Sequence, residues 1–103
     1  MAHRRAPEVD GDLDDIVIEI AKRGGSFEAA ERMVCEITQR FYLLGEYPYL
    51  GRARDHDLGP GRRSHAVGEY IIIYRVEDGD ALILRVVHGR REFEALFDWT
   101  CGS

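Results

Sequence analysis

The chain has 103 residues, of which 45% are hydrophobic, and it carries a net charge of −5. This length predicts a single domain spanning residues 1–103, and the hydrophobic content excludes a wholly disordered chain. The acidic balance argues against a general nucleic-acid binder, because lysine and arginine supply most of the affinity for phosphates, so we expect no direct sequence-specific binding of nucleic acid.

The N-terminal segment 1–6 is polar and is predicted to form a short edge strand ahead of Pro7. It lacks the apolar core of a secretory signal. No apolar run in the chain approaches the roughly 20 residues that cross a bilayer, so no membrane association is expected. These features favour a cytoplasmic protein.

The next segment carries apolar residues at the spacing of one helix face. They are Leu13, Ile16, Val17 and Ile20. The spacing predicts an amphipathic helix that Asp10 or Asp12 caps at its start and that Gly24-Gly25 ends.

A second helix is predicted after Ser26, which is a preferred capping residue, and Gly45 is expected to end it. Its apolar stripe is expected to pack in the core and comprises Phe27, Ala30, Val34, Ile37, Phe41 and Leu44. Because only a few residues separate the two helices, they are predicted to form an αα-hairpin.

Three β-prone runs follow the helices, at 62–67, 69–76 and 81–88. Asp78-Gly79-Asp80 is predicted to join the last two as a tight hairpin, because glycine adopts a positive φ readily. Alternation divides the side chains of the middle run between two faces, with Tyr70, Ile72, Tyr74 and Val76 on one and Ile71, Ile73 and Arg75 on the other.

A final short helix is predicted over 90–98. The expected order is therefore (β)-α-α-β-β-β-(α), an α+β fold in which a helix hairpin packs on a small antiparallel sheet. Both faces of the middle strand are apolar, so we expect one to lie beneath the helices and the other to be covered incompletely and to be available to a partner.

Cys35 and Cys101 are far apart in the sequence and are expected to be free thiols. The four histidines lack the spacing of metal ligands. No nucleophile motif and no phosphate-cradling glycine loop is present. The sequence therefore predicts no metal site and no cofactor, and its motifs identify no catalytic residue.

Arginines concentrate in the second half of the chain, which allows a local basic face within an acidic whole. Those on the predicted sheet and just after it are Arg62, Arg63, Arg75, Arg85, Arg90 and Arg91. Three interpretations stay open for this group. The arginines stabilise the charged phosphorane of RNA cleavage, they bind carboxylates of a protein partner, or they are solvated ends of strands.

Four segments of this half carry a family resemblance: P-Y-L-G-R-A-R-D at 48–55, G-P-G-R-R at 59–63, E-Y-I-I-I-Y-R at 69–75 and L-I-L-R-V-V-H-G-R-R-E-F at 82–93. With A-P-E-V-D-G-D-L-D-D-I at 6–16, the series resembles the ParE toxins of type II toxin–antitoxin modules, within the ParE/RelE superfamily. The resemblance covers nearly the whole chain. It implies a β-α-α-β-β-β fold and a bacterial growth-inhibiting toxin that forms a hetero-oligomer with a ParD-like antitoxin.

The resemblance also implies an activity. ParE-type toxins are understood to poison DNA gyrase by binding it, whereas RelE-type relatives cut mRNA in the ribosomal A site with basic residues and an acid or base side chain. In the RelE-type alternative, the catalytic arginines of this chain would be Arg62, Arg85 and Arg91. The position of the tyrosine in those relatives is Phe97 here, and because phenylalanine has no ionisable proton, a gyrase-directed toxin without catalysis is favoured.

By the same resemblance, an antitoxin segment is expected to bind in an apolar groove between the helix hairpin and the sheet. The residues predicted to line this groove are Tyr49, Leu50, Tyr70, Ile72 and Tyr74. The alternative for these side chains is an internal position in the core. At the rim, Arg54, Arg62 and Arg75 are expected to pair with acidic antitoxin residues.

Overall fold

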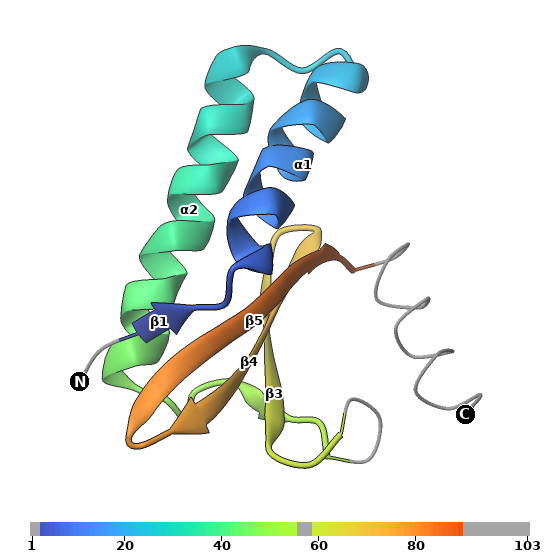
Figure 1. The fold of residues 1–103 in the computed structure, drawn as a ribbon. Helices are drawn as coiled ribbons and strands as arrows, with labels where there is room; N and C mark the ends of the chain where they lie inside the picture. The colour runs from blue at the N-terminus through green and yellow to red at the C-terminus, as the bar shows by residue number, and fades with distance from the viewer. Residues whose placement is uncertain (1–2, 56–58, 90–103) are drawn as a thin grey trace.

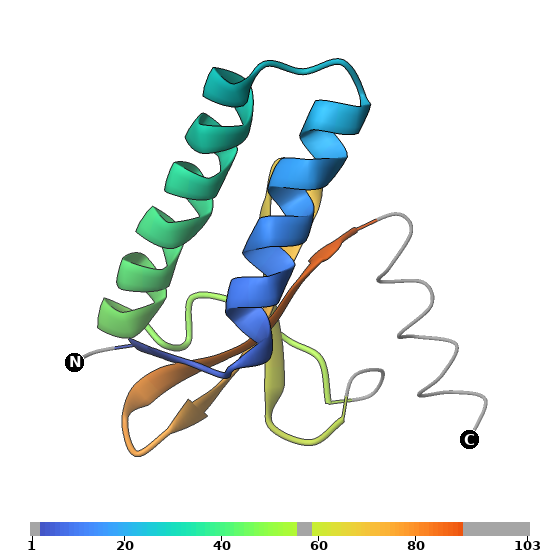
Figure 2. The ribbon, with the colours of Figure 1, turned by 45° about the horizontal axis from the view of Figure 1, so that its top comes forward.

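The computed structural model describes residues 3–55 and 59–89. Its elements in chain order are β1 (His3–Arg5), α1 (Glu8–Lys22), α2 (Phe27–Glu46), β2 (Arg52–Ala53), β3 (Arg62–Val67), β4 (Tyr70–Glu77) and β5 (Asp80–His88). The two helices run side by side and pack against the sheet (Figures 1 and 2), which is the predicted α+β fold. The predicted helix over 90–98 lies outside the described residues.

The sheet has five strands in the order β1-β5-β4-β3-β2. Strands β2 to β5 form antiparallel pairs, whereas β1 pairs with β5 in parallel. The predicted edge strand is therefore confirmed over His3–Arg5, and its parallel pairing makes the predicted antiparallel sheet a mixed one. The helix hairpin and three strands separate β1 from β5 in the chain, and only such a long connection allows two strands to run in the same direction.

The start of α2 agrees with the sequence and the start of α1 does not. Ser26 caps α2, and its hydroxyl accepts a backbone N–H of the first turn at 3.1 Å. Helix α1 begins at Glu8, directly after Pro7, so neither Asp10 nor Asp12 caps it. Proline has a helical φ and needs no backbone acceptor, which suits the beginning of a helix. Asp12 consequently lies inside α1, where it is buried.

The predicted stripe on α2 forms a large part of the core. Its fully buried members are Ala30, Ile37, Phe41 and Leu44. Phe27 was expected in the same stripe but is 74% exposed, which corrects that prediction. The reason is its position as the first residue of α2, at the end of the helix that extends beyond the sheet (Figure 1).

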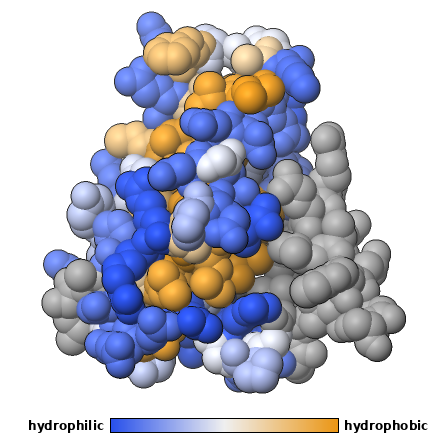
Figure 3. Space-filling model, in the orientation of Figure 1, coloured by the Kyte–Doolittle hydropathy of each residue, from blue (hydrophilic) through white to orange (hydrophobic). Residues whose placement is uncertain are grey.

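Strand β4 alternates between two apolar environments, as predicted. Tyr70, Ile72 and Tyr74 are at most 2% exposed and belong to the core that the helices cover. The opposite face carries a second, smaller cluster formed by Ile71, Ile73, Leu84 and Val87. The space-filling view in Figure 3 shows a mostly hydrophilic face, with hydrophobic atoms gathered near the helices and again lower, over the strands.

The turn between β4 and β5 confirms the predicted hairpin. Glu77 pairs with Asp80, which leaves Asp78 and Gly79 as a two-residue loop. Their φ values are 55° and 80°. A positive φ at both central residues is the geometry that matches the twist of the flanking strands. The sequence Asp-Gly suits this turn because both residue types tolerate the left-handed region.

Two histidines on the helix side of the sheet, His65 and His3, have a lowered pKa. The Arg40 guanidinium on α2 lies 3.0 Å from Nε2 of His65 on β3. Burial, and then the positive charge of Arg40, lower the pKa of His65 below its usual value of 6.5. Burial and the charge of Arg5 lower the pKa of His3 in the same direction.

This lowering predicts a pH-dependent stability. Because the folded pKa is depressed, the unfolded chain binds more protons, so the stabilisation is present above the unfolded value of about 6.5 and is lost as the pH falls through the folded value. We expect the free energy of unfolding, measured by denaturant titration, to decrease between about pH 7.5 and about pH 5.5. His65→Gln should remove part of that decrease, and an unchanged pH dependence in this variant would contradict the assignment.

Candidate partner-binding surface

The register of the strands brings three arginines into one row across the sheet. Arg62 on β3 pairs with Arg75 on β4. Arg75 pairs with Leu82 on β5, and Leu82 pairs with Arg4 on β1. Paired residues project to the same face, and this face is the one opposite the buried Tyr74. All three arginines are exposed, and we call Arg4, Arg62 and Arg75 the arginine row.

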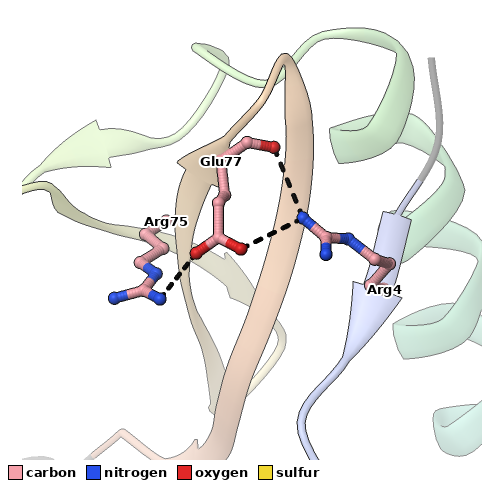
Figure 4. Close-up of polar contacts among 3 residues, drawn as sticks. All are labelled: Arg4, Arg75 and Glu77. Carbon is pink, nitrogen blue, oxygen red and sulfur yellow. Dashed lines mark hydrogen bonds and ion pairs between the residues drawn. The ribbon is translucent and has the colours of Figure 1, made fainter.

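One carboxylate lies within the arginine row (Figure 4). Arg75 donates to Glu77 Oε2 at 2.6 Å, and Arg4 donates to Glu77 Oε1 at 3.3 Å. Arg62 stands directly opposite Arg75, and two like charges in this position repel each other. Three arginines thus lie close together on one face of the described sheet, and such a cluster of positive charge suits a carboxylate from a partner.

Strand β2 adds a further arginine at the edge of the sheet. Arg54 extends the pairing of β2 with β3, because its backbone N–H donates to the Arg62 carbonyl at 2.8 Å. Its guanidinium donates to the Ser64 hydroxyl at 3.3 Å. Ser64 pairs with Ile73, which lies in the cluster on the face of the arginine row. The structure thus brings the three arginines predicted for partner binding to one side of the sheet.

The loop between α2 and β2 presents two of the predicted residues. Tyr49 is 71% exposed and Leu50 is 50% exposed. Tyr74 fixes the loop from below: its hydroxyl donates to the Pro48 carbonyl at 2.8 Å and accepts the Gly51 N–H at 2.8 Å. A Cβ at Gly51 would overlap this hydroxyl, so glycine is required for the close approach. The loop is therefore an exposed element with a fixed backbone.

The predicted groove beneath the helices is wrong in three of its five residues. Tyr70, Ile72 and Tyr74 are buried in the core between the sheet and the helices, so they offer a partner no surface. The physical reason is that the helix hairpin packs directly on this face of β4 and fills the space predicted to be a groove. Tyr49 and Leu50 stay accessible, and their role in binding remains a prediction.

Removing the hydroxyl beneath the loop gives a direct test of its role. Tyr74→Phe leaves the Gly51 N–H and the Pro48 carbonyl without their buried partner. We expect the free energy of unfolding to fall by about 1–3 kcal/mol, which is the usual cost of an unsatisfied buried group. Thermal unfolding measures this loss. Tyr47→Phe is the matched control because Tyr47 is 59% exposed, and an equal loss in both variants would contradict the account.

An ion pair that the sequence did not reveal joins α1 to β5. The buried Asp12 carboxylate accepts from Arg85 Nε at 2.8 Å and from Arg85 Nη2 at 3.0 Å. It also accepts the backbone N–H of Val86 at 2.9 Å. In the pairing of β4 with β5, Leu84 is one extra residue. Such a bulge changes the direction of the side chains beside it, and Arg85 follows it directly.

The three arginines of the RNA-cutting alternative do not form a described site. Arg85 is bound to Asp12, and β4 separates its strand from the strand of Arg62. Arg91 lies outside the described residues. The described part of the chain therefore separates Arg62 from Arg85 in the sheet, and the catalytic set as a whole stays a prediction.

Residues 3–55 and 59–89 provide neither a metal centre nor a membrane-spanning helix. Within these ranges, no three histidine, cysteine, aspartate or glutamate side chains gather closely enough to hold a metal ion. The two described helices also lack the combination of length and hydrophobicity that a membrane-spanning helix needs.

Comparisons with known proteins agree with the observed fold. The model of the family "ParE toxin of type II toxin-antitoxin system, parDE" matches residues 4–93. Toxin ParE3 of Caulobacter vibrioides is 34% identical over 91 residues, which is 88% of this chain and 89% of that protein. A solved structure described as the chromosomal ParDE TA system from P. aeruginosa has the same fold, with a TM-score of 0.72, 23% identity and coverage of 85% of this chain and 95% of that chain. The chain therefore belongs to the ParE family, the toxins of type II ParDE toxin–antitoxin systems.

Proposed function

We propose that this toxin inhibits growth in the bacterial cytoplasm by poisoning DNA gyrase, and that a ParD-like antitoxin neutralises it in a hetero-oligomeric complex. Membership of the ParE family supports the target and the kind of antitoxin. The arginine row supports recognition of carboxylates on a protein, because a guanidinium binds a carboxylate with two parallel hydrogen bonds. The row of like charges on an exposed sheet face is the observation that carries the proposal.

The surroundings of the arginine row support the proposal that the toxin acts by binding a protein and not by catalysis. Cleavage of RNA needs a positioned proton donor or acceptor beside the scissile bond. Glu77 lies in the row, but its two oxygens are bound to Arg75 and Arg4. Among the described histidines, His65 contacts α2 and His88 contacts Arg23 at the end of α1. We therefore propose no catalytic residue for this toxin.

Neutralisation is tested by expression with and without a ParD-like antitoxin from the same genome. The proposal predicts growth arrest when the toxin is expressed alone, rescue by the antitoxin, and a stable complex in size-exclusion chromatography. Normal growth with folded toxin alone, or the absence of a complex, would contradict it. The RelE-type alternative predicts cleaved mRNA in the arrested cells.

The carboxylate inside the row supplies a second test. Glu77→Gln removes the internal negative charge from Arg75 and Arg4. Because charge complementarity mainly sets the rate of encounter, we expect association with an acidic antitoxin to become about 3–10-fold faster at low salt, measured by surface plasmon resonance. Stability should change little because both ion pairs are exposed. Glu36→Gln on α2 has the same change of charge, and an equal acceleration there would show that the effect is not local to the row.

A further inference from the structure

A small pocket opens beside the arginine row, between the loop that precedes β2 and strands β3 and β4. Its volume is about 260 Å³. It is lined by Tyr49, Ala53, Asp55, Gly61, Arg62, Arg63 and Val76, and we call it the Tyr49 pocket. The volume lies below the roughly 300–1,000 Å³ of sites for free small molecules, so the pocket suits a single side chain of a partner.

Arg63 is held in a fixed position in this pocket. Its Nη2 donates to the Gly51 carbonyl at 2.6 Å and to the Tyr49 carbonyl at 3.0 Å. The Tyr49 ring covers the guanidinium at 5.3 Å from the ring centroid. The guanidinium is therefore already ordered before a partner binds, and an ordered group loses little conformational entropy on binding.

The same guanidinium has hydrogen-bonding capacity that the described residues do not use. The Nε of Arg63 is buried and has no hydrogen-bond acceptor. A buried donor without an acceptor is unfavourable, and a guanidinium has five N–H groups to satisfy.

The charges around the pocket select the class of ligand. Arg62 and Arg63 line it with two positive charges, and Asp55 supplies one negative charge. The Asp55 carboxylate already accepts the Gly61 N–H at 2.6 Å, so it closes the turn before β3. Among the described lining residues the balance is one net positive charge, which matches a single carboxylate better than a doubly charged phosphate. The side chains of Ala53 and Val76 supply apolar wall for a short aliphatic stem.

We propose that the Tyr49 pocket receives one glutamate or aspartate side chain of the antitoxin. The carboxylate binds the guanidinium of Arg63, Arg62 adds a second positive charge to the lining, the stem packs on Val76, and the exposed Tyr49 ring shifts to cover it. This inference rests on the proposed neutralisation by an antitoxin. It adds Arg63, which was not among the arginines predicted at the rim of the groove, and it identifies the contact as an anchor in a pocket beside an exposed row.

A protein partner is favoured over a nucleic acid. The whole chain carries a net charge of −5, which repels a long polyanion. The pocket is also lined by a carboxylate, Asp55, which would oppose a phosphate dianion more strongly than a single carboxylate. An extended or helical protein segment presents one acidic side chain among neutral ones and avoids both penalties.

A double-mutant cycle tests the anchor, with the ParD-like antitoxin that neutralises the toxin as the probe. Each acidic residue of the antitoxin is changed to its amide, and the dissociation constant is measured with wild-type toxin, Arg62→Gln and Arg63→Gln. We expect one acidic position whose change costs about tenfold or more in wild type and much less in either arginine variant, because close charge pairs couple strongly. Arg32→Gln is the matched control, since Arg32 is exposed on α2, away from the pocket.

Arg62→Gln keeps the test valid if Arg63→Gln weakens the loop, because Arg62 is exposed on the sheet. The inference is overturned if both pocket variants bind the antitoxin as tightly as Arg32→Gln does. It is also overturned if they keep full antitoxin affinity and lose binding of a short single-stranded RNA instead. If wild-type toxin binds no antitoxin, the proposed function fails together with the anchor, whereas loss of coupling with intact complex formation overturns only the anchor.

Discussion

Replacing Asp12 with alanine is expected to lower the free energy of unfolding by about 2–4 kcal/mol. The change removes two charge-assisted hydrogen bonds to Arg85 and the carboxylate that accepts the buried Val86 N–H. The estimate is below that for a fully buried pair because the Arg85 side chain is 41% exposed and regains water. Chemical denaturation of purified protein measures the loss.

Asp10→Ala is the matched control for this prediction. Asp10 lies in the same part of α1, but its carboxylate contacts Arg5 at 3.2 Å on the surface, with 78% of the side chain exposed. An exposed pair of this kind contributes at most about 1 kcal/mol. If Asp10→Ala and Asp12→Ala destabilise the protein equally, the ion pair between α1 and β5 does not have the structural role assigned to it.

Reversing two charges of the arginine row is expected to disrupt recognition of the antitoxin. Arg62→Glu and Arg75→Glu together place two carboxylates where the row now attracts acidic residues. We expect the association rate to fall about tenfold or more at low salt and the affinity to fall further, because like charges at an interface repel. Stopped-flow association at several salt concentrations measures both, and the difference between variants should shrink as salt screens the charges.

A control for total charge accompanies this variant. Lys22→Glu with Arg32→Glu changes the net charge by the same amount on the helices, away from the row. The account predicts a small, salt-sensitive effect for this control and a large effect for the row. Equal antitoxin binding by wild type and the row variant would contradict the placement of Arg62 and Arg75 at the interface.

The helix cap, the strand bounds and the hairpin turn could be predicted from the sequence because each depends on residues close together in the chain. The bounds of β3 agree with the predicted run at 62–67, and the Asp78-Gly79 turn follows from residues that tolerate positive φ. Ser26 caps α2 for the same reason that serine caps helices in general. Alternation also assigned the correct faces of β4.

Features that depend on packing between elements far apart in the chain could not be predicted from the sequence. Asp12 looks like a helix cap in the sequence, and only the position of α1 beside β5 gives its carboxylate Arg85 and the Val86 N–H as partners. The arginine row depends on register across four strands, including the parallel pairing of Arg4 with Leu82. No spacing in the sequence encodes that register.

In the candidate site, too, the sequence predicted which residues lie on strands but not which side chains are exposed. The sequence named Arg62 and Arg75 because both are arginines on predicted strands, and the structure sets them opposite each other. It could not distinguish Tyr49, which is exposed, from Tyr74, which is buried, because both lie in aromatic-rich segments. Burial depends on where the helix hairpin packs, and that packing joins residues far apart in the chain.

The central claim is that the toxin acts by binding a protein target and breaks no bond itself. The most direct measurement gives purified toxin, without antitoxin, to two reconstituted systems: DNA gyrase with relaxed plasmid, and ribosomes translating a defined mRNA. The account predicts inhibited supercoiling with accumulation of cleaved DNA trapped on gyrase, and intact mRNA. Cuts at defined codons of the ribosome-bound mRNA, with gyrase unaffected, would contradict it.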